Sequence, residues 1–233
     1  MRPPSPAALA AVIDQTLLRP TVSLSEGAEW LAEQRGRGFA AVCVPPSLAG
    51  LAVDAMEGSA TAACSVVGFP LGYDTTAAKA YQAAELADRG CREIDMVVRI
   101  GDLIAGDADT VRADTAAVVK AVDSSSGGDG LVKVILETGY LDPSAILLGC
   151  RLAEEAGARF VKTSTGLGPR GASIEDVHAM RAAVGDRLGI KAAGGIRTFA
   201  DALAMLDAGA TRIGTSAGVE IVAEFEDMAS REP

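Results

Sequence analysis

Short apolar runs alternate with alanine-rich stretches along the chain, and this alternation constrains the fold more than any other feature. Eight runs have the length and the β-branched content of buried strands. They lie at 12–15, 39–44, 62–68, 93–98, 131–136, 159–163, 189–192 and 211–214. Strands that alternate with helices indicate a parallel sheet, because each parallel connection needs a crossover. The sequence therefore predicts an α/β fold.

Helical periodicity fills most intervals between these runs. The clearest helical stretches are 76–89, 143–156, 174–184 and 199–208. Three of them have recognisable starts. Ser173 with Asp176 predicts a capping box, Thr198 precedes a helix, and Asp142 provides a cap that a proline follows.

The same order of helix end, glycine and strand recurs at 89–95, 156–162 and 208–214. Eight βα units in 233 residues predict a single (β/α)8 TIM barrel spanning 1–233, with 1–8 as a loose lead-in. A doubly wound open sheet is the alternative. Residues 124–130 are rich in serine and glycine, so we expect a flexible loop there, not a domain linker.

Composition excludes several classes of function. A net charge of −10 argues against nucleic acid or an anionic membrane as partner. The four cysteines form no C-x-x-C pair and there is a single histidine, so we expect no metal site and reduced thiols in a cytoplasmic protein. No apolar run reaches the roughly 18 residues of a membrane span.

Two lysines end neighbouring strand-like runs: Lys162 closes the sixth and Lys191 the seventh. Burying an ammonium group is costly or lowers its pKa, and a neutral amine can attack a carbonyl to form a Schiff base. On adjacent strands, about 4.8 Å apart, each ammonium would disfavour protonation of the other. One lysine would then be the nucleophile and the other a charged proton donor, in an order that the spacing leaves open. A strand-end lysine that reaches solvent is the alternative for either residue alone.

Further polar residues lie within the apolar runs. Asp95 is in the middle of a strand, where a buried carboxylate needs a partner, so it could pair with a lysine and relay protons. A structural aspartate bonded to the backbone is the alternative. We interpret Glu137 and Lys133 as members of core ion pairs, with a functional role as the equal alternative. Cys43 is interpreted as a pocket-wall or core thiol, and His178 as a surface residue.

Glycine-containing loops follow the last strands. Gly194 and Gly195 precede Arg197 after the seventh strand, and Gly214 opens the loop after the eighth. In a TIM barrel these loops often bind phosphate, because glycine permits close backbone approach and helix N-termini favour an anion. Gly166, after Lys162, would add to this site.

Together these segments resemble the deoxyribose-phosphate aldolases, class I Schiff-base enzymes built on a TIM barrel. The matching segments are 13–18, 41–45, 66–72, 93–97, 132–138, 161–166, 190–198 and 212–216. The resemblance implies reversible cleavage of 2-deoxy-D-ribose 5-phosphate to acetaldehyde and D-glyceraldehyde 3-phosphate, in the catabolism of deoxyribose phosphate. It implies no metal or organic cofactor, phosphosugar and aldehyde substrates, and a homo-oligomer in which a dimer is favoured.

The resemblance also implies residue roles. Lys162 matches the Schiff-base lysine, and Lys191 with Asp95 matches the pair that moves protons. Asp14 and Thr16 are expected near the substrate. The remaining residues expected around the substrate and its phosphate are Thr163, Gly166, Gly194, Gly195, Arg197, Gly214 and Ser216.

The chain departs from the family pattern at several positions. Gln15 stands where many members carry histidine, Leu167 where some have a lysine near the phosphate, and Ala217 where some have a second serine. Many members end in a tyrosine that helps proton transfer, whereas 230–233 contain none, so protons would pass more slowly or through water. The alternatives are a related Schiff-base barrel enzyme with a different or non-phosphorylated aldehyde, and a non-catalytic phosphosugar-binding barrel.

Overall fold

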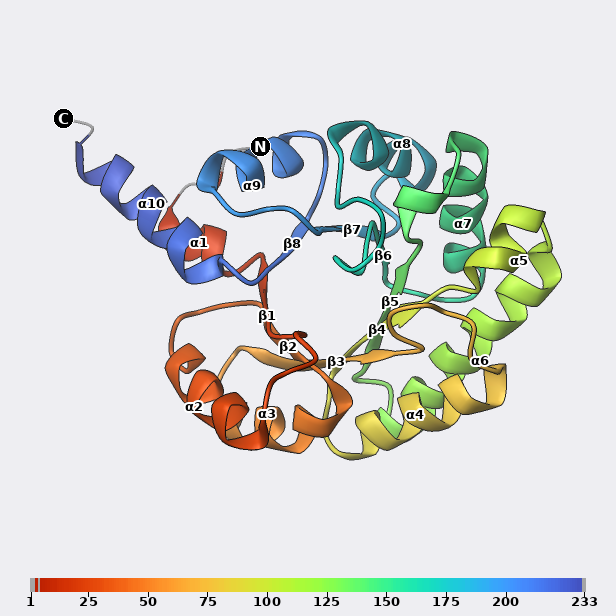
Figure 1. The fold of residues 1–233 in the computed structure, drawn as a ribbon, viewed down its shortest axis with the longest axis horizontal. Coiled ribbons are helices and arrows are strands. Elements are labelled where there is room, and N and C mark those ends of the chain that lie inside the picture. Colours follow the sequence, from red (N-terminus) through yellow and green to blue (C-terminus); the bar gives the residue numbers. More distant parts are fainter. Residues whose placement is uncertain (1–2, 4, 232–233) are drawn as a thin grey trace.

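The strands form a closed parallel barrel in a computed structural model that describes residue 3 and residues 5–231 (Figure 1). They are β1 (Ile13–Thr16), β2 (Ala41–Val44), β3 (Ala62–Val67), β4 (Glu93–Val97), β5 (Leu131–Ile135), β6 (Phe160–Lys162), β7 (Gly189–Ala193) and β8 (Arg212–Thr215). Each strand pairs with the next in the chain, and β1 closes the barrel against β8. The predicted (β/α)8 fold is confirmed.

Helices surround the barrel on all sides (Figure 1). They are α1 (Pro6–Ala10), α2 (Leu24–Gln34), α3 (Ala49–Met56), α4 (Thr76–Asp88), α5 (Ile100–Ala105), α6 (Ala108–Ser126), α7 (Pro143–Glu155), α8 (Ile174–Val184), α9 (Phe199–Asp207) and α10 (Gly218–Arg231), with 3-10 turns η1 (Pro46–Leu48) and η2 (Thr138–Tyr140). No helix in the described part of the chain is long and apolar enough to cross a membrane.

The predicted helix starts are confirmed in position, and one differs in its chemistry. Asp142 accepts a hydrogen bond from Ala145 N at 2.8 Å. Ser173 likewise accepts from Asp176 N at 3.1 Å, but the predicted reciprocal bond of a capping box is missing, because the Asp176 carboxylate pairs with Arg170 instead. The full capping box forms at Thr198.

Two expectations about loose segments need correction. Ser124 to Ser126 are the last turn of α6, which ends at Gly127 in the left-handed conformation, so the loop before β5 is shorter than predicted. Part of the expected lead-in, 1–8, is helical, because Ser5 caps α1 and Leu9 is buried. Residues 1, 2 and 4 lie outside the described residues.

The barrel has two kinds of interior. A large aliphatic core fills the space between the strands and the surrounding helices. Inside the barrel, a small cluster of Ala41, Cys43, Cys64 and Val66 occupies one side. Its Cys64 thiol lies 3.4 Å from both a carboxylate oxygen of Asp95 and the ammonium of Lys133, so charged groups continue the interior. TIM-barrel interiors are usually filled by branched aliphatic side chains, so the charges indicate a site.

Candidate active site

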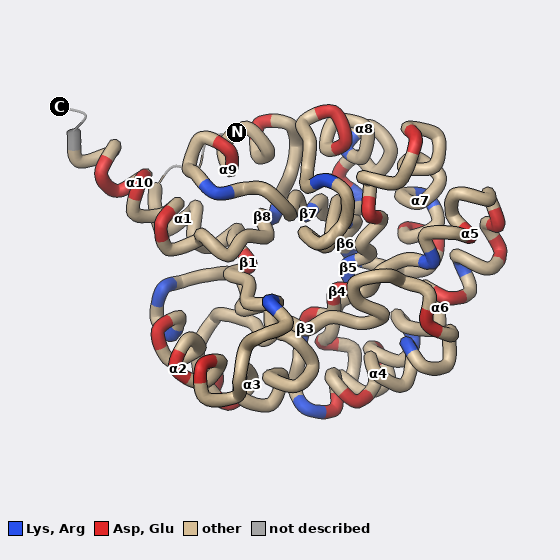
Figure 2. Tube along the Cα trace, in the orientation of Figure 1, with Lys and Arg blue, Asp and Glu red and all other residues tan. Residues whose placement is uncertain are grey.

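A cavity of about 380 Å³ opens at the carboxyl ends of the strands. Its walls come from the segments that follow β1, β6, β7 and β8, namely 16–19, 162, 165–167, 193–197 and 214–216. Three of the lining residues are cationic, Arg19, Lys162 and Arg197, and none is acidic. By contrast, acidic residues are spread over the outer helices (Figure 2). The cavity is therefore a locally positive place in an acidic protein and suits an anionic ligand.

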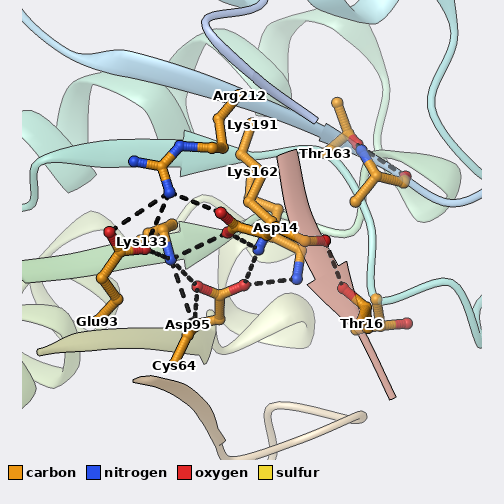
Figure 3. Close-up of polar contacts among 12 residues, drawn as sticks. Asp14, Thr16, Cys64, Glu93, Asp95, Lys133, Lys162, Thr163, Lys191 and Arg212 are labelled. Atoms are coloured by element: carbon orange, nitrogen blue, oxygen red, sulfur yellow. Dashed lines mark hydrogen bonds and ion pairs between the residues drawn. The ribbon is translucent and has the colours of Figure 1, made fainter. Parts of the chain in front are cut away.

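Lys162 forms part of the floor of this cavity and is 3% exposed. It lies opposite Lys191 in the pairing of β6 with β7, as the sequence predicts. Both ammonium groups reach the same oxygen, Oδ2 of Asp95, at 2.7 Å each (Figure 3). The aspartate therefore bridges the two lysines and is not bonded to backbone, which settles the alternative left open for it.

Asp95 is also the centre of a wider network of buried charges (Figure 3). Its Oδ1 accepts from Lys133 Nζ at 2.8 Å, and Lys133 also contacts Glu93 Oε2 at 2.6 Å. Arg212 reaches Asp14 Oδ1 at 2.6 Å and Glu93 Oε2 at 3.1 Å, which closes the ring. Four cations, counting Lys162 and Lys191, thus meet three carboxylates.

Sequence reasoning missed Glu93 and Arg212 as members of this network. Glu93 is two residues before Asp95 on β4 and so shares its face, a signal that strand alternation contained. Arg212 pairs in register with Lys191 across β7 and β8. Its inclusion requires the strand register, which the sequence alone does not provide.

The carboxylates reverse the predicted electrostatics of Lys191. Burial lowers the pKa of Lys191, but the carboxylates of Asp14 and Asp95 outweigh burial and raise it above its usual value. For Asp95, burial acts in the other direction and raises the pKa. The ammonium groups of Lys133, Lys162 and Lys191 outweigh burial and hold this pKa well below its usual range. The expectation that mutual repulsion would dominate is wrong for Lys191, because Asp95 lies between the ammonium groups. Lys191 is therefore held in its charged form.

Two residues expected near the substrate do not line the cavity. Asp14 is fully buried beneath it and paired with Lys191 and Arg212. Thr163 is also buried, and its hydroxyl joins β6 to β7 by donating to Ala193 O at 3.1 Å and accepting from Ala193 N at 3.0 Å. Both residues therefore support the floor. Thr16 does line the cavity.

The predicted glycine loops do meet at the cavity. The wall contains Gly166, Gly194, Gly195, Arg197, Gly214 and Ser216. The backbone N–H groups of Gly166, Gly195, Ile196 and Ser216 have no acceptor among the described residues. Gly194 and Gly195 have φ of 92° and 81°, which a side chain would disfavour. Unpaired N–H groups around a positive cavity are the elements of an anion site.

The positions that depart from the family pattern lie close to this wall. Gln15 is buried, and its side-chain oxygen accepts from Gly218 N at 2.9 Å, so it holds the start of α10. Leu167 is 58% exposed on the cavity wall. Ala217 N donates to Thr215 Oγ1 at 2.9 Å. The cavity therefore lacks a lysine at 167 but has Arg19, which sequence reasoning did not single out.

The structure also locates the other residues named from the sequence, Cys43, His178, Lys133 and Glu137. Cys43 is buried in the barrel, His178 is exposed, and Lys133 is a core ion-pair member as predicted. Glu137 is buried too, but it forms no ion pair with any described residue, so that interpretation is wrong. Thiols and carboxylates that could hold a metal ion gather around Cys64 and Asp95, yet the Lys133 ammonium already contacts both. This donor set is neutralised by lysine.

Comparisons with known proteins agree with this geometry. The profile of the DeoC/LacD family aldolases matches residues 10–224. The chain is 48% identical to the deoxyribose-phosphate aldolase of Thermoanaerobacter sp. (strain X514), covering 94% of this chain and 98% of that one. It is 49% identical to that of Streptococcus pneumoniae (strain JJA), covering 90% and 93%. The deoxyribose phosphate aldolase of Aeropyrum pernix, described as a tetramer, has a similar structure, with a TM-score of 0.87, 32% identity, and coverage of 96% and 93%.

Proposed function

The chain belongs to the DeoC/LacD family of aldolases, and from this premise we propose that it cleaves 2-deoxy-D-ribose 5-phosphate reversibly to acetaldehyde and D-glyceraldehyde 3-phosphate. The observation that carries the proposal is the position of Lys162. Among the described residues it is the one lysine on the cavity wall, and it belongs to a network with one more cation than carboxylates. Loss of a proton from Lys162 leaves that network balanced and frees an amine beside the ligand.

Lys162 acts first, as the nucleophile. Its neutral Nζ attacks the aldehyde carbon C1 of the open-chain sugar, and the resulting carbinolamine loses water to give an iminium. The positive iminium replaces the ammonium that Asp95 contacts at 2.7 Å, so the carboxylate can stabilise it. The network therefore holds a cation in this position before and after the bond forms.

The carbon–carbon bond breaks next. The C3 hydroxyl gives up its proton, the electrons of the C2–C3 bond move toward the iminium, and D-glyceraldehyde 3-phosphate leaves. The remaining enamine takes a proton at C2, and water then hydrolyses the iminium to release acetaldehyde and free Lys162. Asp95 and Lys191 exchange these protons through water, because both lie beneath the cavity wall. Asp95→Asn should lower kcat by about 10²- to 10⁴-fold.

The wall formed by the glycine loops would bind the phosphate. Backbone N–H groups of Gly166, Gly195 and Ser216 are available there, and Arg197 adds a charge. Leu167 in place of a family lysine supports a second candidate, a Schiff-base aldolase for a sugar without phosphate. Cleavage of 2-deoxyribose with and without the 5-phosphate separates the two. Equal kcat/KM for both sugars would contradict the phosphate assignment.

Reductive trapping tests the central step. Incubation with acetaldehyde and borohydride, followed by peptide mass mapping, should place one adduct on Lys162 and none in Lys162→Arg. Labelling elsewhere, or none, contradicts both enzyme readings and favours a barrel that only binds phosphosugars.

Assembly and location belong to the same proposal. We propose a homodimer in the cytoplasm. Four buried, unpaired thiols support a reducing compartment, and the tetramer described for the Aeropyrum pernix protein supports self-association. Sedimentation velocity at micromolar concentration should give a dimer, and a monomer at every concentration would contradict it.

A further inference from the structure

Glu137, two residues after β5 and directly before η2, has an unfavourable backbone and an unfavourable environment. Among the described residues it is the one non-glycine with positive φ, at 57°, a conformation that residues with a side chain disfavour. The residue is 1% exposed, and its Oε1 has no hydrogen-bond partner among the described residues. Neither feature stabilises the fold, so the residue calls for a functional explanation.

Unpaired polar atoms gather around this residue. Buried side-chain oxygens without a partner in the described chain also occur at Thr138 and Ser164, next to the ends of β5 and β6. The single one elsewhere is on Gln34. Most buried polar groups are paired in folded proteins, so a concentration of exceptions marks a segment held for function.

The Glu137 carboxylate holds the loop that forms one wall of the cavity. Its Oε2 accepts a hydrogen bond from Thr165 N at 3.0 Å, and the Thr165 hydroxyl in turn accepts from Leu167 N at 3.0 Å. These two bonds lie on either side of Gly166, whose N–H has no acceptor in the described chain. The turn that presents Gly166 to the cavity is therefore fixed from Glu137.

The same loop is packed against the carboxylate farther along. A Cβ added at Gly168 would lie 2.7 Å from Oε1 and 2.8 Å from Cδ of Glu137. Beyond it, Arg170 donates to Thr138 O at 3.1 Å and pairs with Asp176. The segment between Lys162 and α8 is thus clamped onto η2 at two points.

We propose that Glu137 is a positioning residue that shapes the phosphate-binding wall, an inference that rests on the proposed function. It does not line the cavity and acts through Thr165 and Gly166. Its loss should therefore weaken binding of the phosphorylated sugar and leave the chemistry at Lys162 largely intact.

Glu137→Gly separates this role from a structural one, because glycine suits a positive φ while the carboxylate is removed. We expect KM for 2-deoxyribose 5-phosphate to rise about tenfold, as for loss of a hydrogen bond to a charged group, with little change in kcat and no fall in Tm. Glu137→Asn, which also tolerates positive φ but is too short to reach Thr165 N, should behave alike. A fall in Tm with unchanged KM contradicts the proposal.

Gly168→Ala approaches the same contact from the other side. Gly168 does not have positive φ, so alanine fits its backbone, but the new Cβ would displace the Glu137 carboxylate. KM should rise in the single variant and rise no further when Gly168→Ala is added to Glu137→Gly. Fully additive effects on KM would show that the two residues act separately and would overturn the inference.

Trapping with acetaldehyde and borohydride keeps this failure distinct from failure of the proposed function. If the natural protein is not labelled on Lys162, the proposed function is wrong. If it is labelled and Glu137→Gly has the same KM for the phosphorylated sugar, only the role of Glu137 is wrong.

Discussion

Buried lysines occur in two regions of this protein and have different roles there. Between α4 and α6, Lys79 pairs with Asp114 at 2.7 Å, and both side chains are inaccessible. The Lys79 ammonium also donates to Val97 O at 3.0 Å, and Thr76 satisfies the other Asp114 oxygen at 2.7 Å. In the barrel, by contrast, Lys162 and Lys191 share one oxygen of Asp95.

The difference lies in charge count and access. Lys79 and Asp114, here called the helix-layer pair, are one cation and one carboxylate without contact with the cavity. They therefore have no proton to exchange with a ligand. The barrel network has one more cation than carboxylates, and Lys162 lies on the cavity wall. A buried lysine is therefore no sign of catalysis by itself. A cation that has no matching carboxylate and can reach a ligand does indicate catalysis.

The sharpest way to break this comparison is to replace each lysine by methionine. Lys162→Met should lower kcat by roughly 10⁴-fold or more, because no other amine lines the cavity in the described chain. Lys79→Met should keep kcat within about threefold when measured on folded protein at low temperature. Comparable losses in both would mean that burial, not access, decides the role.

Stability should respond in the opposite sense. Lys79→Met leaves Asp114 buried without its cation and should cost about 3–5 kcal/mol of unfolding free energy, measured by urea denaturation. Asp114→Leu added to it should recover most of that loss, since replacing a whole buried pair by apolar groups is often neutral. If the double variant is no more stable than the single one, the pair has a role beyond charge balance.

The stability of the protein in acid should depend on the carboxylates of the barrel network. The surrounding cations hold the pKa values of Asp14 and Asp95 below their usual range, even though burial raises them. At pH below the unfolded carboxyl value of about 3.9, the unfolded state therefore binds protons that the folded state does not. The stabilisation that Asp14 and Asp95 contribute is complete above about pH 4. It is lost as pH falls toward the lower pKa values that these carboxylates have in the folded protein.

Urea denaturation between about pH 5 and pH 2.5 measures this loss. The variant Lys79→Met with Asp114→Leu should keep the acid slope, and Asp95→Asn should reduce it. If the pH dependence of the unfolding free energy disappears in the double variant, the acid-sensitive charges lie at Lys79 and Asp114 and not in the barrel network.

The smallest expected effect is at the cavity rim. Arg19 lines the cavity but is half exposed and contacts Glu26 at 3.3 Å, so its charge is screened. Arg19→Ala should raise KM for the phosphorylated sugar by about threefold at low salt, and less at high salt. The matched control is Arg151→Ala on α7, also exposed and outside the cavity wall. An equal effect in both variants would indicate a general effect of net charge.

How much the sequence predicted can be seen from particular residues. The alternation of runs located all eight strands to within two residues at each end, because apolar strands and glycine-terminated helices leave local signals. Lys162 and Lys191 were found because each interrupts an apolar strand end. Lys79 was not, because a lysine in a helix is unremarkable until its neighbours are known.

Arg212, Glu137 and the helical end of α6 show where local signals stop. Arg212 enters the network through register, since it lies opposite Lys191. The φ of 57° at Glu137 has no sequence signature, because glycine or asparagine is the usual sign of such a turn. Ser124 to Ser126 are helical although their composition favours a loop, because α6 continues to Gly127.

The amino-acid sequence by itself determined the (β/α)8 barrel, the nearness of two lysines on adjacent strands, and the loops that meet above them. Those properties depend on residue spacing, which the chain carries locally. The charge balance depends on the folded barrel, because the cations and carboxylates of the network come from six different strands. A carboxylate placed between two ammonium groups attracts both and outweighs their mutual repulsion, and the closed barrel brings Asp95 to that position.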